Sequence, residues 1–282
     1  MILVFGKTGQ VATELRRLVD VVALDRHDAD LLKPQDCAEA IRVRVPKAVI
    51  NAAAYTDVDR AEREEPLATV INADAPTAMA EACAELRIPM VHISTDYVFG
   101  GTGKNSWKPY DPIAPQNVYG RSKLSGEIGV RDSGAVHAIL RTSWVVSAHG
   151  LNFVKTMLRL SETQDSLRVV ADQIGGPTPA RDIAVACLQI VEQLTHVSSK
   201  SGTYHYSGGP DVSWAEFAAE IFRQANKTVY VQPITTIDYP TPAKRPLNSR
   251  MDCSAIQQIF GIPRPDWRHG LNTILKELEA TS

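Results

Sequence analysis

Short apolar runs alternate with helical patterns through the first half of the chain. Residues 2–5, 48–50 and 90–93 are largely apolar and lack polar alternation, as is typical of strands buried on both faces of a parallel sheet. Further strands are expected at 21–24 and 136–140, and helices at 11–19, 34–43, 66–86 and 117–131. This order predicts an α/β fold with a Rossmann-like, doubly wound parallel sheet.

The pattern loosens after Trp144. A Gly/Pro-rich loop (DQIGGPTP, 172–179) and a proline-rich connection (DYPTPAKRP, 238–246) separate a short strand at 203–206 and helices at 213–224 and 267–280. We predict a Rossmann domain over 1–147 and a smaller, mainly substrate-binding lobe over 148–282. The segment at about 179–208 is expected to return to the first domain.

The first strand ends in GKTGQVA, which places Gly6, Gly9 and Ala12 at three-residue intervals. Glycine after a strand permits a tight turn and a close approach to a pyrophosphate, and the following helix offers its N–H groups and positive dipole end. The position at the start of a βαβ unit favours nucleotide binding over a turn without a ligand.

Two side chains after the second strand bear on the choice of nicotinamide cofactor. Asp25, nineteen residues after Gly6, suits hydrogen bonds to an adenosine ribose and favours NAD, whereas Arg26 suits a 2′-phosphate. We therefore expect loose discrimination between NADH and NADPH, with a solvated turn as the alternative. Asp30 and Leu31 are placed to flank the adenine.

The stretch VYGRSKLSGE puts Tyr119 and Lys123 four residues apart in an expected helix, and hence on one face. An ammonium group beside a phenol lowers the phenol pKa, which suits proton transfer to a carbonyl oxygen that receives hydride. The same lysine is placed to hold the nicotinamide ribose. Among eight tyrosines, roughly 0.4 such pairs are expected from average residue usage, so the pair proves nothing by itself and its context must decide.

Polar residues follow two other expected strands. VHISTDYVFGG runs from an apolar strand into Thr95 and Asp96, at the strand end where parallel sheets bind ligands. Thr95 is placed to donate to the same substrate oxygen as Tyr119. Residues 51–54 (Asn51 and three alanines, including Ala53 and Ala54) suit a strand end where a cofactor lies close. The alternative for Thr95 and Asp96 is a capped turn without a ligand, and the alternative for residues 51–54 is a tight packing site.

Composition narrows the class of protein. Of its 282 residues, 44% are hydrophobic and 22% are charged, and the formal net charge is -2. This charge balance does not indicate a surface that binds nucleic acid or anionic membranes. No leader or membrane span is expected. The four scattered cysteines indicate reduced thiols in a cytoplasmic protein: Cys37, Cys83, Cys187 and Cys253.

The motifs GKTGQVA, NAAAYTDVDRAE, STDYVF, YGRSK and RTSW resemble the extended short-chain dehydrogenase/reductase family. The resemblance extends over nearly the whole chain and includes NFVKTMLRL, DQIGGPTP and YPTPAKRPLNSR. Within this family, the chain resembles the reductases of dTDP-linked sugars most specifically. It implies hydride transfer from NADPH or NADH to the C4 ketone of dTDP-4-dehydro-6-deoxy-L-mannose, which would yield dTDP-L-rhamnose.

The resemblance also implies roles for individual residues. Tyr119 is the expected proton donor, Lys123 its partner and ribose ligand, and Thr95 completes the triad. The expected cofactor contacts are Gly9, Gln10, Val11, Asp25, Asp30, Leu31, Ala54, Tyr55, Thr56 and Ile93. The expected sugar-nucleotide contacts are Val58, Thr95, Asp96, Tyr97 and Trp144. Trp144 is equally consistent with a core position. Arg245 is the candidate for the diphosphate, with an unpaired surface arginine as the alternative.

The chain departs from the family at Ala12, where a third glycine is usual. Some relatives are dimers bridged by Mg²⁺ through glutamates, and Glu14 matches one such position. We predict no metal, a solvated Glu14, and a monomer or homodimer.

Two other functions remain open. One is reduction of another nucleotide-linked 4-keto-6-deoxysugar, such as the talose epimer. The other is a non-catalytic subunit resembling the β subunit of methionine adenosyltransferase, which the intact Thr95, Tyr119 and Lys123 disfavour.

Overall fold

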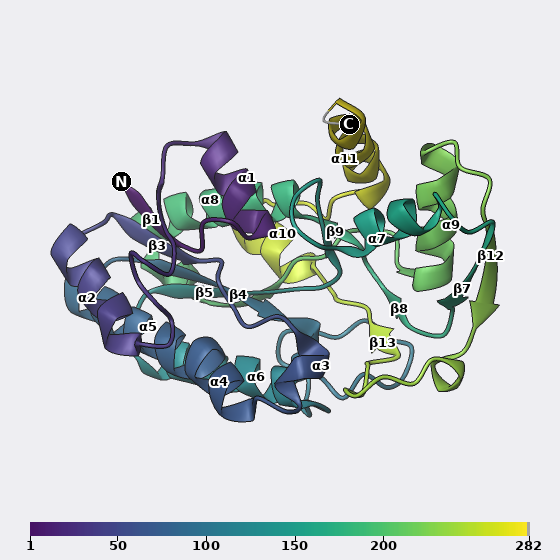
Figure 1. Ribbon diagram of the computed structural model, residues 1–282. Helices are drawn as coiled ribbons and strands as arrows, with labels where there is room; N and C mark the ends of the chain where they lie inside the picture. Colours follow the sequence, from purple (N-terminus) through teal and green to yellow (C-terminus); the bar gives the residue numbers. More distant parts are fainter. Residues whose placement is uncertain (281–282) are drawn as a thin grey trace.

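The computed structural model of the chain describes residues 1–280. A six-stranded parallel sheet runs through its larger part (Figure 1). In spatial order the strands are β10 (Gly202–His205), β5 (His137–Thr142), β4 (Met90–Thr95), β3 (Ala48–Asn51), β1 (Ile2–Phe5) and β2 (Val22–Leu24). The predicted α/β fold is confirmed, and the strand order reverses between β1 and β3, the kind of place where such sheets bind ligands.

Helices cover both faces of this sheet (Figure 1). One face carries α1 (Gln10–Leu18), α8 (Ala180–His196) and α10 (Ser254–Phe260), and the other α2 (Pro34–Arg44), α5 (Ala75–Leu86) and α6 (Val118–Asp132). Alternate side chains of β1 enter the two cores: Val4 packs on the first side, and Leu3 and Phe5 on the second. Burial on both sides explains the uninterrupted apolar runs in the sequence.

The helix expected over residues 66–86 contains a π-helical turn. The structure divides it into α4 (Glu65–Thr69), the π turn η1 (Val70–Asp74) and α5. Asn72 in the π turn accepts from the backbone N–H of Tyr55 at 2.8 Å and donates to Ser122 Oγ on α6 at 3.0 Å. Single π turns are frequent near functional sites, and this one ties the end of β3 to α6.

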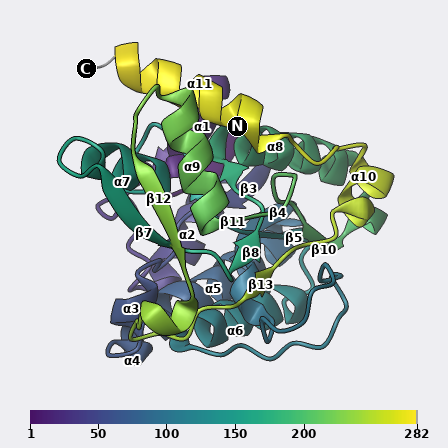
Figure 2. The same cartoon turned by 90° about the vertical axis from the view of Figure 1, so that its right-hand side faces the viewer.

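A smaller lobe lies beside the sheet and faces the viewer in Figure 2. It contains α7 (Phe153–Leu160), β7 (Ser166–Val170), α9 (Trp214–Gln224), β12 (Tyr230–Ile234) and α11 (Trp267–Ala280). Its own core includes Phe217 and Trp267. Ser213 begins α9 through a capping box with Glu216, which explains where this helix starts.

Short elements complete the chain. They are α3 (Val58–Ala61), β6 (Val145–Val146), β8 (Ile174–Gly175), β9 (Thr178–Pro179), β11 (Val212–Ser213), β13 (Asn248–Ser249) and the 3-10 turns η2 (Asp96–Val98), η3 (Ser198–Lys200) and η4 (Thr236–Asp238). Over residues 1–280, no helix combines the length and apolar character needed to cross a membrane.

Candidate active site

Thr95, Tyr119 and Lys123 come together where β4 ends and α6 begins. Asn117 is the N-cap of α6, and its Oδ1 accepts from the backbone N–H of Gly120 at 2.8 Å. Tyr119 and Lys123 then lie one helical turn apart. The helix start therefore brings a phenol and an ammonium group to the carboxyl edge of the sheet.

The Thr95 side chain lies within reach of the Tyr119 hydroxyl, where a hydrogen bond from it favours the phenolate form. Thr95 Oγ1 lies 3.2 Å from Asp96 Oδ1, which competes with Tyr119 for its single proton, and it accepts from the backbone N–H of Tyr97 at 3.1 Å. Burial raises the pKa of Tyr119, and the Thr95 hydrogen bond opposes this. The expected lowering of the pKa of Tyr119 is therefore wrong for this arrangement, and the phenol is held as a neutral proton donor.

Lys123 is almost completely buried, with 2% of its surface exposed. Its Nζ donates to the backbone oxygen of Ile93 at 2.7 Å and lies 3.3 Å from His92 Nε2. Burial lowers the pKa of Lys123 to about 8, and the nearby Glu127 carboxylate opposes this. The lysine thus titrates much closer to neutral pH than a solvated one.

Asp96 is buried beside Thr95, and its Oδ2 has no hydrogen-bond partner within residues 1–280. Burial raises the pKa of Asp96 to about 6, and hydrogen bonds from Ser249 and Thr95 oppose this. A buried carboxylate oxygen without a partner is costly, because it has lost its water without a replacement. A hydroxyl group of a bound ligand would supply that missing hydrogen bond.

The glycine turn fits a dinucleotide. Gly6 has φ +101°, a conformation that side chains rarely allow, and a Cβ there would lie 3.4 Å from the backbone of Ala52. Gly9 precedes α1 without a side chain to cap the helix, so the positive helix end remains open to an anion. Ala12 is fully buried, and the packing accommodates its methyl group where the family usually has glycine.

Two further predicted cofactor residues follow this turn. Gln10 is half-buried, and its Oε1 accepts from Ser147 Oγ at 2.8 Å and from Asn152 Nδ2 at 3.1 Å. Val11, which belongs to α1, packs into the core between that helix and the sheet. Gln10 therefore joins the first helix to the segment after β6, and its contact with a cofactor stays a prediction.

Lys7 is the residue that the sequence interpretation missed at the ribose end. Its Nζ lies 3.0 Å from Asp25 Oδ2, while Asp25 Oδ1 accepts from the backbone N–H of His27 at 2.8 Å. The Lys7 hydrogen bond, followed by that from His27, lowers the pKa of Asp25 to about 2. Arg26 is exposed beside this pair. Lys7 was visible inside GKTGQVA, but only the fold shows which carboxylate it meets.

The other predicted cofactor residues follow β2 and β3 in the chain. Asp30 is half-buried and accepts from a backbone N–H two residues on, and Leu31 packs against the second core. Tyr55 donates its hydroxyl proton to Glu64 at 2.7 Å, and Thr56 is exposed. Their cofactor contacts stay predictions.

Asn51 lies at the end of β3 and is buried. Its Oδ1 accepts from the backbone N–H of Ala53 at 3.1 Å, and its Nδ2 lies 3.1 Å from His92 Nδ1. The amide thus supports the turn after β3 from within the protein, while Ala53 and Ala54 are half-buried. His92 had no assigned role in the sequence interpretation, although it stands out there as a polar residue in an apolar strand.

Arg245 reaches this region from the proline-rich connection. Its Nη2 lies 2.6 Å from Asp59 Oδ2, and its Nη1 lies 3.4 Å from the Tyr97 hydroxyl oxygen. The alternative of an unpaired surface arginine is therefore wrong, while the diphosphate contact stays a prediction. The ring of Tyr97 packs edge-on against Tyr119 with centroids 5.5 Å apart, and Val58 begins α3 nearby.

Trp144 is half-buried and has a left-handed backbone with φ +48°. Its ring stacks on Trp214 with centroids 3.5 Å apart and planes 12° apart. A Cβ on Gly175 would lie 2.9 Å from Ser249 Cβ and 3.0 Å from the Trp144 ring, so a side chain there would displace one of them. Unfavourable backbone conformations cluster at functional sites. Trp214 was not assigned from the sequence, because its 70-residue separation from Trp144 hides the stacking.

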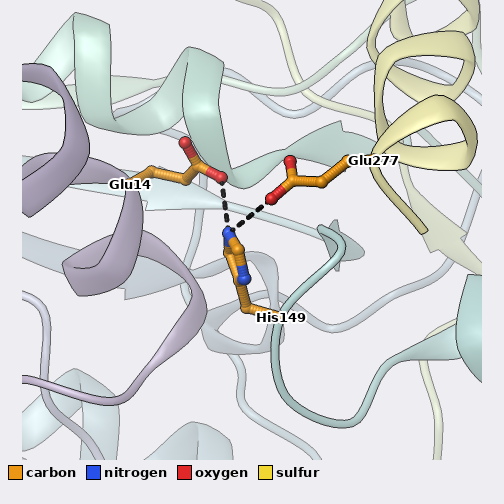
Figure 3. A group of neighbouring side chains, drawn as sticks. All are labelled: Glu14, His149 and Glu277. Atoms are coloured by element: carbon orange, nitrogen blue, oxygen red, sulfur yellow. Dashed lines mark hydrogen bonds and ion pairs between the residues drawn. The ribbon is translucent and has the colours of Figure 1, made fainter. Parts of the chain in front are cut away.

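Glu14, His149 and Glu277 form a separate cluster (Figure 3). Glu14 is only 4% exposed, so the expectation of a solvated side chain is wrong. His149 Nε2 lies 3.0 Å from Glu14 Oε1 and 3.6 Å from Glu277 Oε1. Arg17 Nη1 lies 2.5 Å from Glu277, and Arg181 Nη1 lies 3.5 Å from Glu14. The cluster's ligand atoms suit a cation, but the arginines already neutralise the carboxylates.

The reversed strand order, the glycine turn before the first helix and the Thr95–Tyr119–Lys123 group at the carboxyl edge of the sheet define a class. They are the features of a short-chain dehydrogenase/reductase.

Comparison with known proteins narrows this class. A family model described as RmlD substrate binding domain matches residues 1–280. A dTDP-4-dehydrorhamnose reductase from Sinorhizobium fredii is 43% identical over 96% of this chain and 95% of the relative. The crystal structure of a dTDP-4-dehydrorhamnose reductase from Clostridium acetobutylicum is 36% identical, with a TM-score of 0.92 and 99% of each chain covered. That of the Bacillus anthracis enzyme in complex with NADP is 36% identical, with a TM-score of 0.90 and 98% of each chain covered.

The chain belongs to the RmlD family, whose curated members that it matches include dTDP-4-dehydrorhamnose reductases.

Proposed function

We propose that this chain reduces the C4 ketone of dTDP-4-dehydro-6-deoxy-L-mannose to dTDP-L-rhamnose, with hydride from NADPH or NADH. The observation that carries the proposal is that Tyr119 and the buried Lys123 lie one turn apart at the start of α6, with the Thr95 side chain within reach of the Tyr119 hydroxyl. It occurs in a chain similar over its full length to reductases of that activity.

Tyr119 would supply the proton in this reaction. A nicotinamide held at the glycine turn would supply the hydride that C4 of the sugar takes up, which would leave negative charge on the ketone oxygen. The neutral phenol of Tyr119 gives its proton to that oxygen, and Thr95 supports the phenol through their hydrogen bond. The Lys123 ammonium group stabilises the phenolate that remains, because opposite charges attract strongly in a buried site.

A nicotinamide cofactor is supported by the Bacillus anthracis relative in complex with NADP. In this chain the open turn from Gly6 to Gly9 would hold its pyrophosphate. The negative charge of Asp25 is balanced by Lys7, and Arg26 lies beside it in the chain, so this end of the site would admit either NADH or NADPH. A cytoplasmic location and a monomeric or homodimeric state remain parts of the proposal.

The sugar nucleotide would lie between the sheet edge and the smaller lobe. Asp96 would bind a sugar hydroxyl through its unpartnered oxygen, and Trp144 would offer an aromatic face. Arg245 would contact the diphosphate, for which it must share its guanidinium with Asp59. Val58 and Tyr97 would line the same space.

The test replaces Tyr119 with phenylalanine and follows nicotinamide absorbance during reduction of the dTDP-linked ketone. Turnover should fall by roughly two to four orders of magnitude, because the proton donor is lost, while cofactor affinity stays near that of the wild type. Tyr110→Phe is the control, since Tyr110 is exposed. Near-normal turnover of the Tyr119 variant would reject the assignment.

A further inference from the structure

His92 is a buried histidine that the reduction described above does not use. It lies on β4 and is paired in register with Asn51 of β3. Its two ring nitrogens have different neighbours: Nε2 lies 3.3 Å from Lys123 Nζ, and Nδ1 lies 3.1 Å from Asn51 Nδ2. The imidazole therefore links the lysine of the proposed active site to a buried amide.

The orientation of the Asn51 amide fixes the tautomer of His92. The backbone N–H of Ala53 needs an acceptor and finds it in Asn51 Oδ1 at 3.1 Å, so the amide nitrogen faces the imidazole. An amide nitrogen only donates, so His92 Nδ1 must accept. Burial, followed by the charge of Lys123, lowers the pKa of His92 well below its ordinary value. The single proton of the neutral ring therefore lies on Nε2.

This tautomer places two donors against each other. An ammonium group on Lys123 carries only N–H bonds, and His92 Nε2 also carries one. A neutral amine at Lys123 would instead accept the Nε2–H hydrogen bond and still donate to the Ile93 backbone oxygen. The contact is therefore unfavourable for the charged lysine and favourable for the neutral one.

We propose that Asn51 and His92 are positioning residues that favour the neutral amine form of Lys123, in addition to the effect of burial. The inference rests on the proposed function and deepens it. After Tyr119 has given its proton to the substrate oxygen, the phenolate must regain one, and Lys123, which the contact with His92 makes a stronger acid, is the proton source one turn away on the same helix. The resulting amine accepts the His92 hydrogen bond without proton transfer, and later regains a proton from water.

Other titratable groups face this pair, and none of them substitutes for it. Tyr119 and Glu127 on α6 flank Lys123, and Glu127 favours the charged lysine. Glu127 is itself paired with Arg141 on β5. On the other side, His137 of β5 adds to the lowering of the pKa of His92.

The first test is ¹⁵N NMR of the whole protein with labelled histidine, which reports the protonated nitrogen of each neutral ring. His92 should carry its proton on Nε2. His205 is the internal control, because its Nδ1 lies 3.0 Å from the Trp107 backbone oxygen and must carry the proton there. A His92 protonated on Nδ1 would overturn the inference. This readout needs no substrate, so it stands apart from failure of the proposed function.

The second test replaces Asn51 with the isosteric aspartate. A carboxylate accepts from Nδ1–H, which turns Nε2 into an acceptor for the Lys123 ammonium group. The alkaline limb of kcat should move upward by roughly one pH unit or more, and the Lys123 ¹³Cε titration should move with it. His92→Phe removes the opposing donor and should move both upward by less. A downward shift in His92→Phe would refute the role of His92. A His92 proton that stays on Nε2 in Asn51→Asp would refute the control of the tautomer by Asn51, and no shift although the proton has moved to Nδ1 would refute the coupling to Lys123.

Discussion

Replacing Arg141 with methionine should destabilise the fold, because it leaves the buried carboxylate of Glu127 without its main cationic partner. Glu127 and Arg141 are 0% and 1% exposed, and two hydrogen bonds of 2.8 and 2.6 Å join them. Breaking such a pair from one side costs about 3–5 kcal/mol. Ser94 and Arg131 keep their contacts with Glu127 at 2.6 and 3.1 Å. We therefore expect the loss in free energy of unfolding near the lower limit, about 3 kcal/mol.

The stability deficit of Arg141→Met should change with pH, and the pKa of Glu127 fixes the direction of that change. Burial alone would raise the pKa of Glu127, but hydrogen bonds led by that of Arg141 lower it in the wild type. The pair therefore contributes stability above the pKa of an unfolded glutamate, about 4.3, and this is lost as the pH falls through the lower folded pKa. In Arg141→Met the pKa of Glu127 should rise, so the difference between the two proteins shrinks toward acid pH.

Urea unfolding at neutral pH and near pH 4.5 measures both effects. Arg42→Met is the control, because Arg42 pairs with Glu85 at the surface, where ion pairs contribute little. Equal losses of stability in the Arg141 and Arg42 variants at neutral pH, or an Arg141 deficit that does not change with pH, would contradict the role of the buried pair.

Three further predictions concern the site and its support. Lys7→Met leaves the Asp25 carboxylate without its cation, so the KM for NADPH should rise roughly tenfold relative to that for NADH in steady-state assays; equal changes would exclude this role. Because the pKa of Asp96 is about 6, the KM for the sugar nucleotide should rise as the pH falls below that value, and Asp96→Asn should abolish the dependence. Gly126→Ala places a Cβ 2.0 Å from the backbone oxygen of the facing π turn and should cost about 1–3 kcal/mol in urea unfolding. Gly100→Ala meets only ordinary contacts at 3.7 Å, and an equal loss there would argue against the steric cause.

The buried strands could be predicted from the sequence because burial on both faces leaves a direct apolar signal. The start of α6 could also be predicted from the sequence, since Asn117 is a residue type that favours the N-cap position. The helix at 180–196 was not predicted as such, because it directly follows a Gly/Pro-rich loop and begins without a side-chain cap. The π turn at 70–74 has no distinct sequence signal, since its residues suit an α-helix equally well.

The candidate site was predictable where motifs are local and unpredictable where contacts are distant. The spacing of Tyr119 and Lys123 could be read from one helix. The contact of Asn51 with His92 depends on the register of two parallel strands, which the sequence does not specify. Likewise, the burial of Glu14 depends on His149 and Glu277 from distant elements, so a charged residue on a surface helix was wrongly expected to be solvated.

The most direct measurement follows deuterium from NADPH, and separately from NADH, deuterated at the transferable C4 position. The purified protein is incubated with dTDP-4-dehydro-6-deoxy-L-mannose, and the product is examined by NMR. We expect dTDP-L-rhamnose that carries deuterium at C4 of the sugar. Deuterated product with the talose configuration would contradict the proposed substrate geometry, and no transfer of deuterium would contradict the reductase itself.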